Sequence, residues 1–380
     1  MSQDIENFTA GSYEQQYQYK SFLPNIINLQ WKISDPEVLT LMDDANRLLG
    51  ELNAFSQLIP NVDFFIRMHI AKEATTSSRI EGTRTNMEEA LIDEKDINPE
   101  SRDDWQEVQN YIQAINFAIK ELERLPLSNR LFKETHKILL QGVRGKHKQP
   151  GEFRVSQNWI GLSLKNATFV PPHHEHVVDL MSDLEMFLHN EEIHVPHLIK
   201  IAIVHYQFET IHPFLDGNGR LGRLLIILYL IGFKLLAKPA LYISDFFERH
   251  KAEYYDHLMA VRTNNKMIAW VKFFLFGLRE TAAKSIEVFK AILVLKEQIE
   301  RERIPTFHAR RQGNAQKLIA YLYQRPIVTI KLVSELLGTQ ANTASKLVAD
   351  FSKLGILREL TGRRRNRLFI FDEYTRIFIE

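Results

Sequence analysis

The chain has 380 residues, a formal net charge of +1 and no cysteine. Its 45% hydrophobic and 25% charged residues are ordinary for a soluble globular protein, and the length favours two or three domains. The lack of cysteine excludes disulfides, thiolate metal sites and a cysteine nucleophile.

Two features of the sequence favour a cytoplasmic location. The first residues, Met1–Glu6, are polar and acidic and do not resemble a signal peptide. The longest apolar run, residues 221–236, is interrupted by glycines and charged side chains and falls short of a membrane span. We therefore expect no membrane contact.

Charge is unevenly distributed along the chain. From Arg310 onward there are 13 basic and 6 acidic residues, a net +7, which leaves −6 for the rest. This asymmetry indicates a separate C-terminal unit that could face nucleic acid.

The N-terminal half is expected to be mainly helical. Residues 1–35 are mixed in composition and predict an arm that packs on the main body. Beyond them, apolar residues recur at helical spacing. They predict helices over 36–58 (closed by Pro60), 62–80, 87–93, 103–125 and 127–143, the last with Ser128 as its N-cap.

The end of the predicted helix 62–80 has unusual chemistry. Glu81 adds a carboxylate at the last turn, where the helix dipole disfavours negative charge, and Gly82 is typical of the residue that ends a helix. One interpretation is a solvated glutamate beside a glycine cap. The other is that Glu81 points at a cation elsewhere in the fold.

The pattern changes from helical to strand-like between residues 151 and 170. Alternating polar and apolar residues, interrupted by a turn at Lys165–Ala167, predict a small β-hairpin. Its expected strands are 151–155, 159–164 and 168–170.

Three close histidines, His173, His174 and His176, follow this hairpin. They lie at the entry to a helix and have no partner carboxylate at metal-ligand spacing. The pattern therefore does not favour a zinc site.

The remaining core is again predicted to be helical, and a distinct unit ends the chain. Expected core helices cover 177–190, 197–211, a segment with Tyr254 and Tyr255, 268–278 and a charged connector at 281–303. The last unit is expected to contain helices 316–323, 329–337 and 339–354 and strands 355–360 and 368–371. Helix-turn-helix followed by a hairpin with a basic turn resembles a winged helix. Contact with DNA and contact with protein are both left open.

The stretch from His212 to Arg223 is the strongest candidate for a chemical site. A histidine and Asp216 precede a Gly-Asn-Gly-Arg turn, and a long apolar run follows it. Glycine backbone N–H groups and a helix N-terminus bind phosphate, and two arginines three residues apart can grip its oxygens. Asp216 suits Mg²⁺, and His212 suits proton transfer near neutral pH.

Other nucleotide-binding signatures do not fit. Residues 217–222 formally match the dinucleotide fingerprint, but the preceding segment is helical rather than a strand of a βαβ unit. No Walker A sequence is present. A different kind of nucleotide site is required.

The whole stretch resembles the core motif of the Fic family, His-Pro-Phe-x-Asp/Glu-Gly-Asn-Gly-Arg-x-x-Arg, with every fixed position matched. Gly151-x-Phe153-Arg154 and residues 162–172 are similar to the segments that lead into and form the family's target-docking flap. Ser77-x-x-x-Glu81-Gly82 is similar to the inhibitory-helix motif of self-restrained members. The resemblance covers residues 60–285, and this subgroup commonly carries a C-terminal winged helix.

The resemblance implies a protein adenylyltransferase, which moves AMP from ATP to Ser, Thr or Tyr hydroxyls of target proteins and of itself. His212 would be the general base, Asp216 would hold Mg²⁺, and Glu81, with Ser77, would restrain the site by pairing with Arg223. The ATP-binding residues would be Gly217, Asn218, Gly219, Arg220, Leu221, Gly222, Arg223 and, as an adenine-pocket wall, Tyr254.

The implied architecture is mainly α, an all-helical Fic core with a small hairpin flap and a C-terminal winged helix. Its expected divisions are an N-terminal region with the inhibitory helix (1–100), the core (101–285), a helical connector (286–310) and the winged helix (311–380). Target protein is expected to dock on the flap, and a homodimer is left open.

Two other functions are also left open. One is a Fic fold that uses another donor, such as UTP or a phosphocholine nucleotide, or that removes AMP. The other is a DNA-binding regulator in which the Fic core senses nucleotide.

Overall fold

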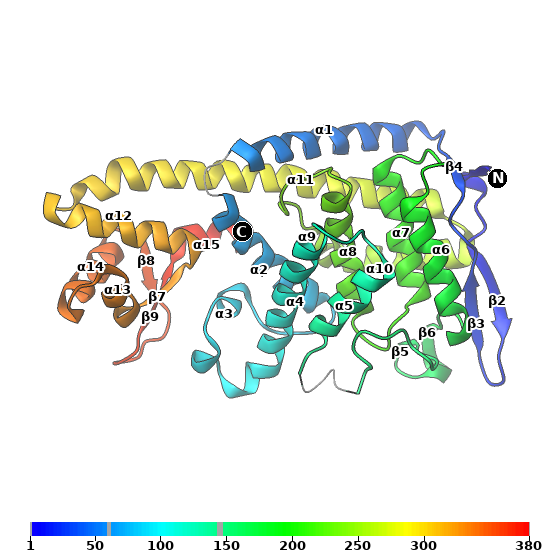
Figure 1. The fold of residues 1–380 in the computed structure, drawn as a ribbon, viewed down its shortest axis with the longest axis horizontal. Helices are drawn as coiled ribbons and strands as arrows, with labels where there is room; N and C mark the ends of the chain where they lie inside the picture. The colour runs from blue at the N-terminus through cyan, green and yellow to red at the C-terminus, as the bar shows by residue number, and fades with distance from the viewer. Residues whose placement is uncertain (1, 59–61, 143–146, 380) are drawn as a thin grey trace.

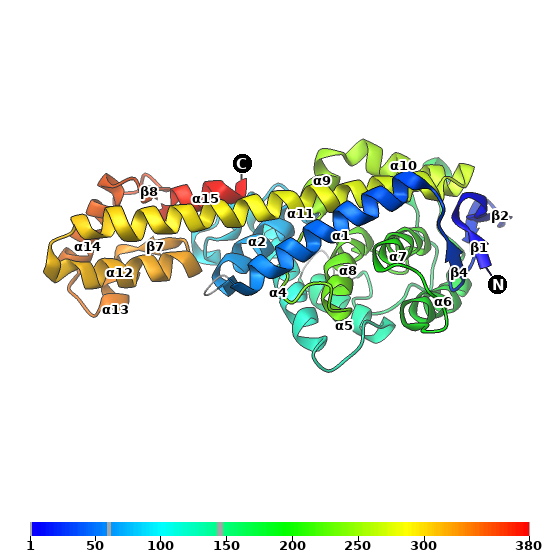
Figure 2. The same ribbon diagram turned by 90° about the horizontal axis from the view of Figure 1, so that it is seen from above.

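The computed structural model describes residues 2–58, 62–142 and 147–379. Within that part of the chain there are fifteen α-helices, and the strands form only four small sheets. The molecule is elongated, with α1 (Pro36–Leu58) lying beside the long helix α11 (Met267–Gln298) (Figures 1 and 2). The predicted mainly helical fold is confirmed.

The N-terminal segment forms two small sheets at one end of the molecule. β1 (Ser2–Asp4) pairs in parallel with β4 (Gln30–Lys32), and β2 (Gly11–Gln15) pairs antiparallel with β3 (Lys20–Pro24). The backbone N–H of Phe22 donates to Val170 O at 3.0 Å. The arm therefore packs against the predicted flap.

The core is built around two consecutive helices, α7 (His197–Ile211) and α8 (Asn218–Gly232). Nearly every side chain of both is buried, including the polar ones. A helix that is apolar on all sides belongs in an interior, and this explains why the apolar run after Arg223 lies at the centre of the fold.

The other core helices surround this pair. The predicted helices at 62–80, 103–125 and 127–143 appear as α2 (Val62–Ile80), α4 (Arg102–Glu121) and α5 (Asn129–Leu139). Ser128 caps α5, and its hydroxyl accepts the N–H of Leu131. Pro60 and Val143, expected at helix ends, lie outside the described residues. The remaining members are α3 (Met87–Ala90), α6 (Val177–His189), α9 (Ser244–Arg249) and α10 (Lys251–Asn264).

Two predictions about the core were wrong. Residues 151–155 form no strand, because the backbone N–H of Arg154 donates to Pro213 O in the motif loop rather than to a neighbouring strand. Only β5 (Ile160–Gly161) and β6 (Ala167–Phe169) make the hairpin. The helices expected at 268–278 and 281–303 are largely one continuous helix, α11, followed by a π-helical segment at Ile299–Arg303. The buried stripe continues through Leu278 and Ala282, so nothing interrupts it.

The C-terminal unit is a helix-turn-helix with a small sheet. Its helices are α12 (Ala309–Gln324), α13 (Ile330–Leu337) and α14 (Ala341–Lys353), and β7 (Ile327–Thr329), β8 (Leu357–Glu359) and β9 (Leu368–Phe371) pair in the order β7-β9-β8. The final helix, α15 (Asp372–Ile379), was not predicted and packs against α2 and α11.

Candidate active site

The motif from His212 to Arg223 joins the end of α7 to the start of α8. His212 caps α7 in the left-handed conformation (φ 51°), and Gly217 (φ 75°) precedes α8 in the same conformation. The Asn218 side chain closes the loop between them, donating to Phe214 O at 2.8 Å and accepting from Phe214 N–H at 2.9 Å. The Asn218 side chain therefore shapes the loop.

A buried histidine on α5 supports the same loop. His136 Nε2 donates to Asp216 O at 2.9 Å, and His136 Nδ1 accepts the N–H of Gly151 at 2.9 Å. Its ring stacks on Phe214 with centroids 3.8 Å apart. Burial lowers the pKa of His136 to about 4, which keeps the ring neutral, as this pair of bonds requires.

The Asp216 carboxylate lies at the mouth of the loop and is partly exposed. Its Oδ1 accepts the N–H of Gly217 at 2.6 Å and lies 3.7 Å from Arg220 Nη2. Arg220 in turn pairs with Glu107 at 3.1 Å. Asp216 and Arg220 line a cleft between α4, the end of α5 and the motif.

The His212 side chain is half-buried beside this loop. Its Nδ1 has no hydrogen-bond partner among the described residues. Burial, followed by the charges of Arg262 and Arg154, lowers the pKa of His212 to about 4. The imidazole is therefore neutral near pH 7 and can accept a proton.

Glu81 and Arg223, 142 residues apart in sequence, form an ion pair at the start of α8. Arg223 Nη2 donates to Glu81 Oε1 at 2.7 Å and to Ser77 O at 2.9 Å, and Arg223 Nε donates to Ser77 Oγ at 2.9 Å. Burial alone would raise the pKa of Glu81, but the charge and hydrogen bond of Arg223 lower it overall. The carboxylate is thus ionised near neutral pH.

The same carboxylate covers the helix N-terminus. A Cβ added to Gly219 would collide with Glu81 Oε1, so the carboxylate rests against the first turn of α8. Helix N-termini favour anions because their first N–H groups are unpaired within the helix. Glu81 therefore lies where an anionic ligand would meet both α8 and Arg223.

Arg154 is a buried residue of this site that the sequence offered only as part of a resemblance. Its Nε donates to His212 O at 3.0 Å, and its Nη2 donates to Pro172 O at 2.6 Å and Ile211 O at 3.3 Å. The Asn158 side chain also donates to His212 O, at 3.1 Å. Together they tie the base of the flap to the backbone of the histidine.

Replacing Arg154 by methionine is expected to destabilise the fold by roughly 3 kcal/mol or more, because several buried carbonyl oxygens lose their donors. Urea unfolding measures this effect. Arg130→Met is the matched control. Arg130 is an exposed arginine paired with Glu134 on one helix face, and its loss is expected to change the stability little. Equal stability of both variants would show that Arg154 is not structural.

Arg262 of α10 is a second buried cation with no signal in the sequence. It donates to Thr210 Oγ1 and Glu209 O, both at 3.1 Å, and its guanidinium lies 3.8 Å from the centroid of the Phe169 ring. Arg262 therefore joins α7 to the flap strand β6.

The structure places Tyr254 in the core. Its side chain is 1% exposed, its hydroxyl donates to His205 Nε2 at 2.9 Å, and its ring stacks on Phe247. It therefore offers no exposed ring as an adenine-pocket wall in this conformation. The adjacent Tyr255 is 39% exposed.

Two other residues of the motif have structural contacts. Leu221 is buried in the core, and the Gly222 carbonyl accepts from His205 Nδ1 at 2.9 Å.

The described residues contain no cluster of histidine and acidic side chains able to hold a metal ion by itself, and this includes His173, His174 and His176.

Fold and site together define a helical protein with a glycine loop at a helix N-terminus, a histidine beside that loop and an internal carboxylate paired with the arginine of the motif. Residues 39–120 match the N-terminal domain of the Fic/DOC family, residues 126–230 match the Fic/DOC domain, and residues 316–369 match a helix-turn-helix DNA-binding domain. The chain belongs to the Fic/DOC family.

Curated relatives carry the name protein adenylyltransferase Fic. One from Aedes aegypti is 36% identical over 111 residues, which cover 28% of this chain and 19% of the relative. One from Drosophila grimshawi is 26% identical over 236 residues, covering 60% of this chain and 44% of the relative. The matched segments thus span less than half of these relatives' own lengths.

Solved structures support the fold. A Fic family protein from Desulfovibrio desulfuricans aligns with a TM-score of 0.57 and 21% identity, covering 90% of this chain and 97% of that one. A Fic domain containing signaling protein from Bacteroides thetaiotaomicron aligns with a TM-score of 0.51 and 17% identity, covering 67% and 97%. No helix among the described residues is long and apolar enough to cross a membrane.

Proposed function

We propose that this protein transfers AMP from ATP to Ser, Thr or Tyr hydroxyls of proteins, including itself, and that Glu81 holds the site inactive. The observation that carries the proposal is the position of the Glu81 carboxylate, which pairs with Arg223 over the N-terminus of α8. A negative group is already bound where the terminal phosphate of ATP would bind.

His212 acts as the general base in this proposal. The hydroxyl oxygen of the target attacks the α-phosphorus, its proton moves to the neutral imidazole, and the bond to the β-phosphate breaks with release of pyrophosphate. Arg154 and Asn158 hold the His212 backbone, which restricts where the ring can point. A neutral ring near pH 7 supports this role.

The phosphates would lie in the loop at the start of α8. Backbone N–H groups of Gly217 to Gly219 and the Arg220 guanidinium would bind the α- and β-phosphates, and Arg223 would pair with the γ-phosphate once Glu81 leaves. These donors act where negative charge develops during transfer, so they stabilise the transition state.

Asp216 fits a magnesium ion through the chemistry of its donor set. Mg²⁺ is commonly held by one or two carboxylates and by substrate phosphates rather than by an all-protein cage, and Asp216 offers a partly exposed carboxylate at the loop. When bound, the ion would neutralise phosphate charge. For the adenine, the exposed ring of Tyr255 is a better candidate than the buried Tyr254.

The flap is the proposed docking edge for the target protein. Within the described residues β5 pairs only with β6, so its outer edge remains open for another strand. Leu162, directly after β5, is 94% exposed. An exposed apolar side chain beside an open strand edge suits contact with a partner chain.

Replacing Leu162 by aspartate is expected to reduce modification of target proteins about tenfold, the effect of losing roughly 1.4 kcal/mol of apolar contact. ATP binding should not change. Labelling of cell lysate by the full chain, compared with ATP affinity, measures both quantities. Val294→Asp, at an exposed apolar position on α11, is the control. Unchanged lysate labelling by the Leu162 variant would argue against docking at the flap.

DNA binding by the C-terminal unit is a second candidate function, favoured by the helix-turn-helix match and the net +7 charge. In the structure two arginines of the hairpin contact acidic residues of the core, Arg358 with Glu88 at 2.6 Å and Arg363 with Asp96 at 3.5 Å. Phosphate contact predicts that affinity for duplex DNA falls steeply as salt rises. A salt-insensitive affinity would favour a protein partner instead.

A further inference from the structure

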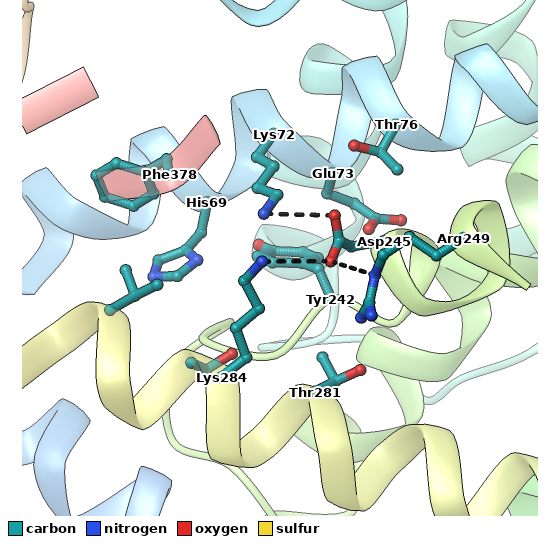
Figure 3. Close-up of a pocket in the computed structure, with 12 residues that line it drawn as sticks. His69, Lys72, Glu73, Thr76, Tyr242, Asp245, Arg249, Thr281, Lys284 and Phe378 are labelled. Atoms are coloured by element: carbon teal, nitrogen blue, oxygen red, sulfur yellow. Dashed lines mark ion pairs between the residues drawn. The ribbon is translucent and has the colours of Figure 1, made fainter. Parts of the chain in front are cut away.

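A second cavity lies between α2, α9, α11 and α15, away from the His212 loop (Figure 3). It is a small cavity that opens to solvent. Its walls come from the Fic core, from the helix that leads to Glu81 and, through Phe378, from the last helix of the chain. None of the motifs in the sequence points to it.

Three cations meet one carboxylate in this cavity. Lys72, Arg249 and Lys284 lie 3.4, 3.3 and 3.9 Å from the oxygens of Asp245, and Figure 3 shows them converging on it from three different helices. Burial, and after it the charges of Lys284 and Arg249, lower the pKa of Lys72 even though Asp245 opposes the shift. Three cationic side chains therefore share this carboxylate.

Four buried polar atoms of the cavity wall have no hydrogen-bond partner in the described part of the chain. They are His69 Nε2, Glu73 Oε2, Tyr242 Oη and Thr281 Oγ1. Each of these side chains is at least nine-tenths buried. Buried polar groups are nearly always paired, so such a group of unpaired atoms around one space indicates something that binds there.

Glu73 lies on the wall of the same cavity, where burial disfavours its charged form. Burial raises its pKa, and its Oε1 already accepts hydrogen bonds from the hydroxyls of Tyr111 and Ser244. Its other oxygen, Oε2, is the atom without a partner. The hydroxyls of Tyr242 and Thr281 can donate.

We propose that this cavity binds a compact oxyanion, either free phosphate or the phosphate of a monoester, between Lys72, Arg249 and Lys284. The hydroxyl groups of Tyr242 and Thr281 would complete its hydrogen bonds. The space beside the cations is small, so a tetrahedral anion suits it better than a whole nucleotide. This site is separate from the ATP site and does not depend on the proposed transfer reaction.

The test measures binding of potassium phosphate to the full chain by calorimetry, at constant ionic strength set with potassium chloride. Lys284→Met and Arg249→Met each remove one partly exposed cation and should weaken binding about tenfold, since each charge-assisted bond contributes about 1.4 kcal/mol or more. Lys290→Met, an exposed lysine of α11 paired with Glu51, is the matched control and should bind as the unmodified protein does.

A readout at the site separates the cavity from the His212 loop. Phosphate should protect Lys284 from chemical acetylation and leave Lys290 unprotected, as read by peptide mass spectrometry. Tighter binding of phosphate than of phosphoserine supports the free anion, and the reverse supports a monoester. No saturable binding, or equal affinity in Lys284→Met, Arg249→Met and Lys290→Met, would overturn the proposal.

Discussion

Glu81→Gly is expected to raise self-labelling of the protein with radioactive ATP roughly 10- to 100-fold. The substitution removes the carboxylate from Arg223 and from the first turn of α8, so the γ-phosphate can take its place. A hydrogen bond between charged groups contributes about 1.5–3 kcal/mol, and each 1.4 kcal/mol is tenfold in rate. The Glu81 side chain is 36% exposed, which screens the pair and favours the lower part of that range.

Two further variants make this result specific. Glu123 is an exposed glutamate in the turn after α4, a position similar to that of Glu81 in the turn after α2. The Glu123→Gly variant should leave labelling unchanged. Glu81→Gln keeps the size and one hydrogen bond but not the charge, and should give intermediate labelling. Equal labelling of the Glu81→Gly protein and the unmodified protein would mean that Glu81 is not a brake.

His212→Ala, made in the Glu81→Gly background, is expected to lower labelling by a factor of about 10² to 10⁴, the usual contribution of a general base. His212 is the one histidine within the motif itself. Its ring is neutral near pH 7, and its Nδ1 has no partner among the described residues. The initial rate of labelling measures the loss, and ATP affinity should remain similar.

His194→Ala is the control, because His194 is exposed and uses its backbone rather than its ring to contact Gln30. If the His212→Ala protein labels at an unchanged rate, another group removes the proton, and the assignment of the base is wrong.

The helical core could be predicted because its signals are local. Apolar spacing predicted a helix at about 62–80, where α2 lies, and Ser128 was predicted as the N-cap of α5. The motif from His212 to Arg223 is continuous in the sequence, and the turn chemistry of Gly217 needs no distant contact. Helix periodicity and turn residues are both properties of neighbouring positions.

The contacts that hold the site could not be predicted, because they join positions far apart. Arg154 lies in a stretch of alternating residues that predicted a strand. Its side chain instead donates to carbonyl groups 57 and 58 residues away in the sequence. His136 and Arg262 carry no local signal of burial. Charged and polar residues are usually exposed, so their inward orientation depends on tertiary partners.

The burial of Tyr254 also could not be predicted from the sequence. A pair of adjacent tyrosines on a helix gives two side chains about 100° apart around its axis, so only the packing decides which one is buried. The structure buries Tyr254 against His205 and leaves Tyr255 partly exposed. The ion pair between Glu81 and Arg223 was a hypothesis from resemblance, and no spacing rule links residues 142 positions apart.

The proposed transfer of AMP is tested most directly by incubating the Glu81→Gly protein with ATP labelled at either the α- or the γ-phosphorus. Transfer of AMP predicts that phosphorus at the α position stays on the protein, that phosphorus at the γ position is released, and that the intact mass rises by one adenylyl group. It also predicts that neither UTP nor a phosphocholine nucleotide labels the protein comparably. Retention of γ-phosphorus, preferential labelling by another donor, or no labelling from ATP at all would contradict it.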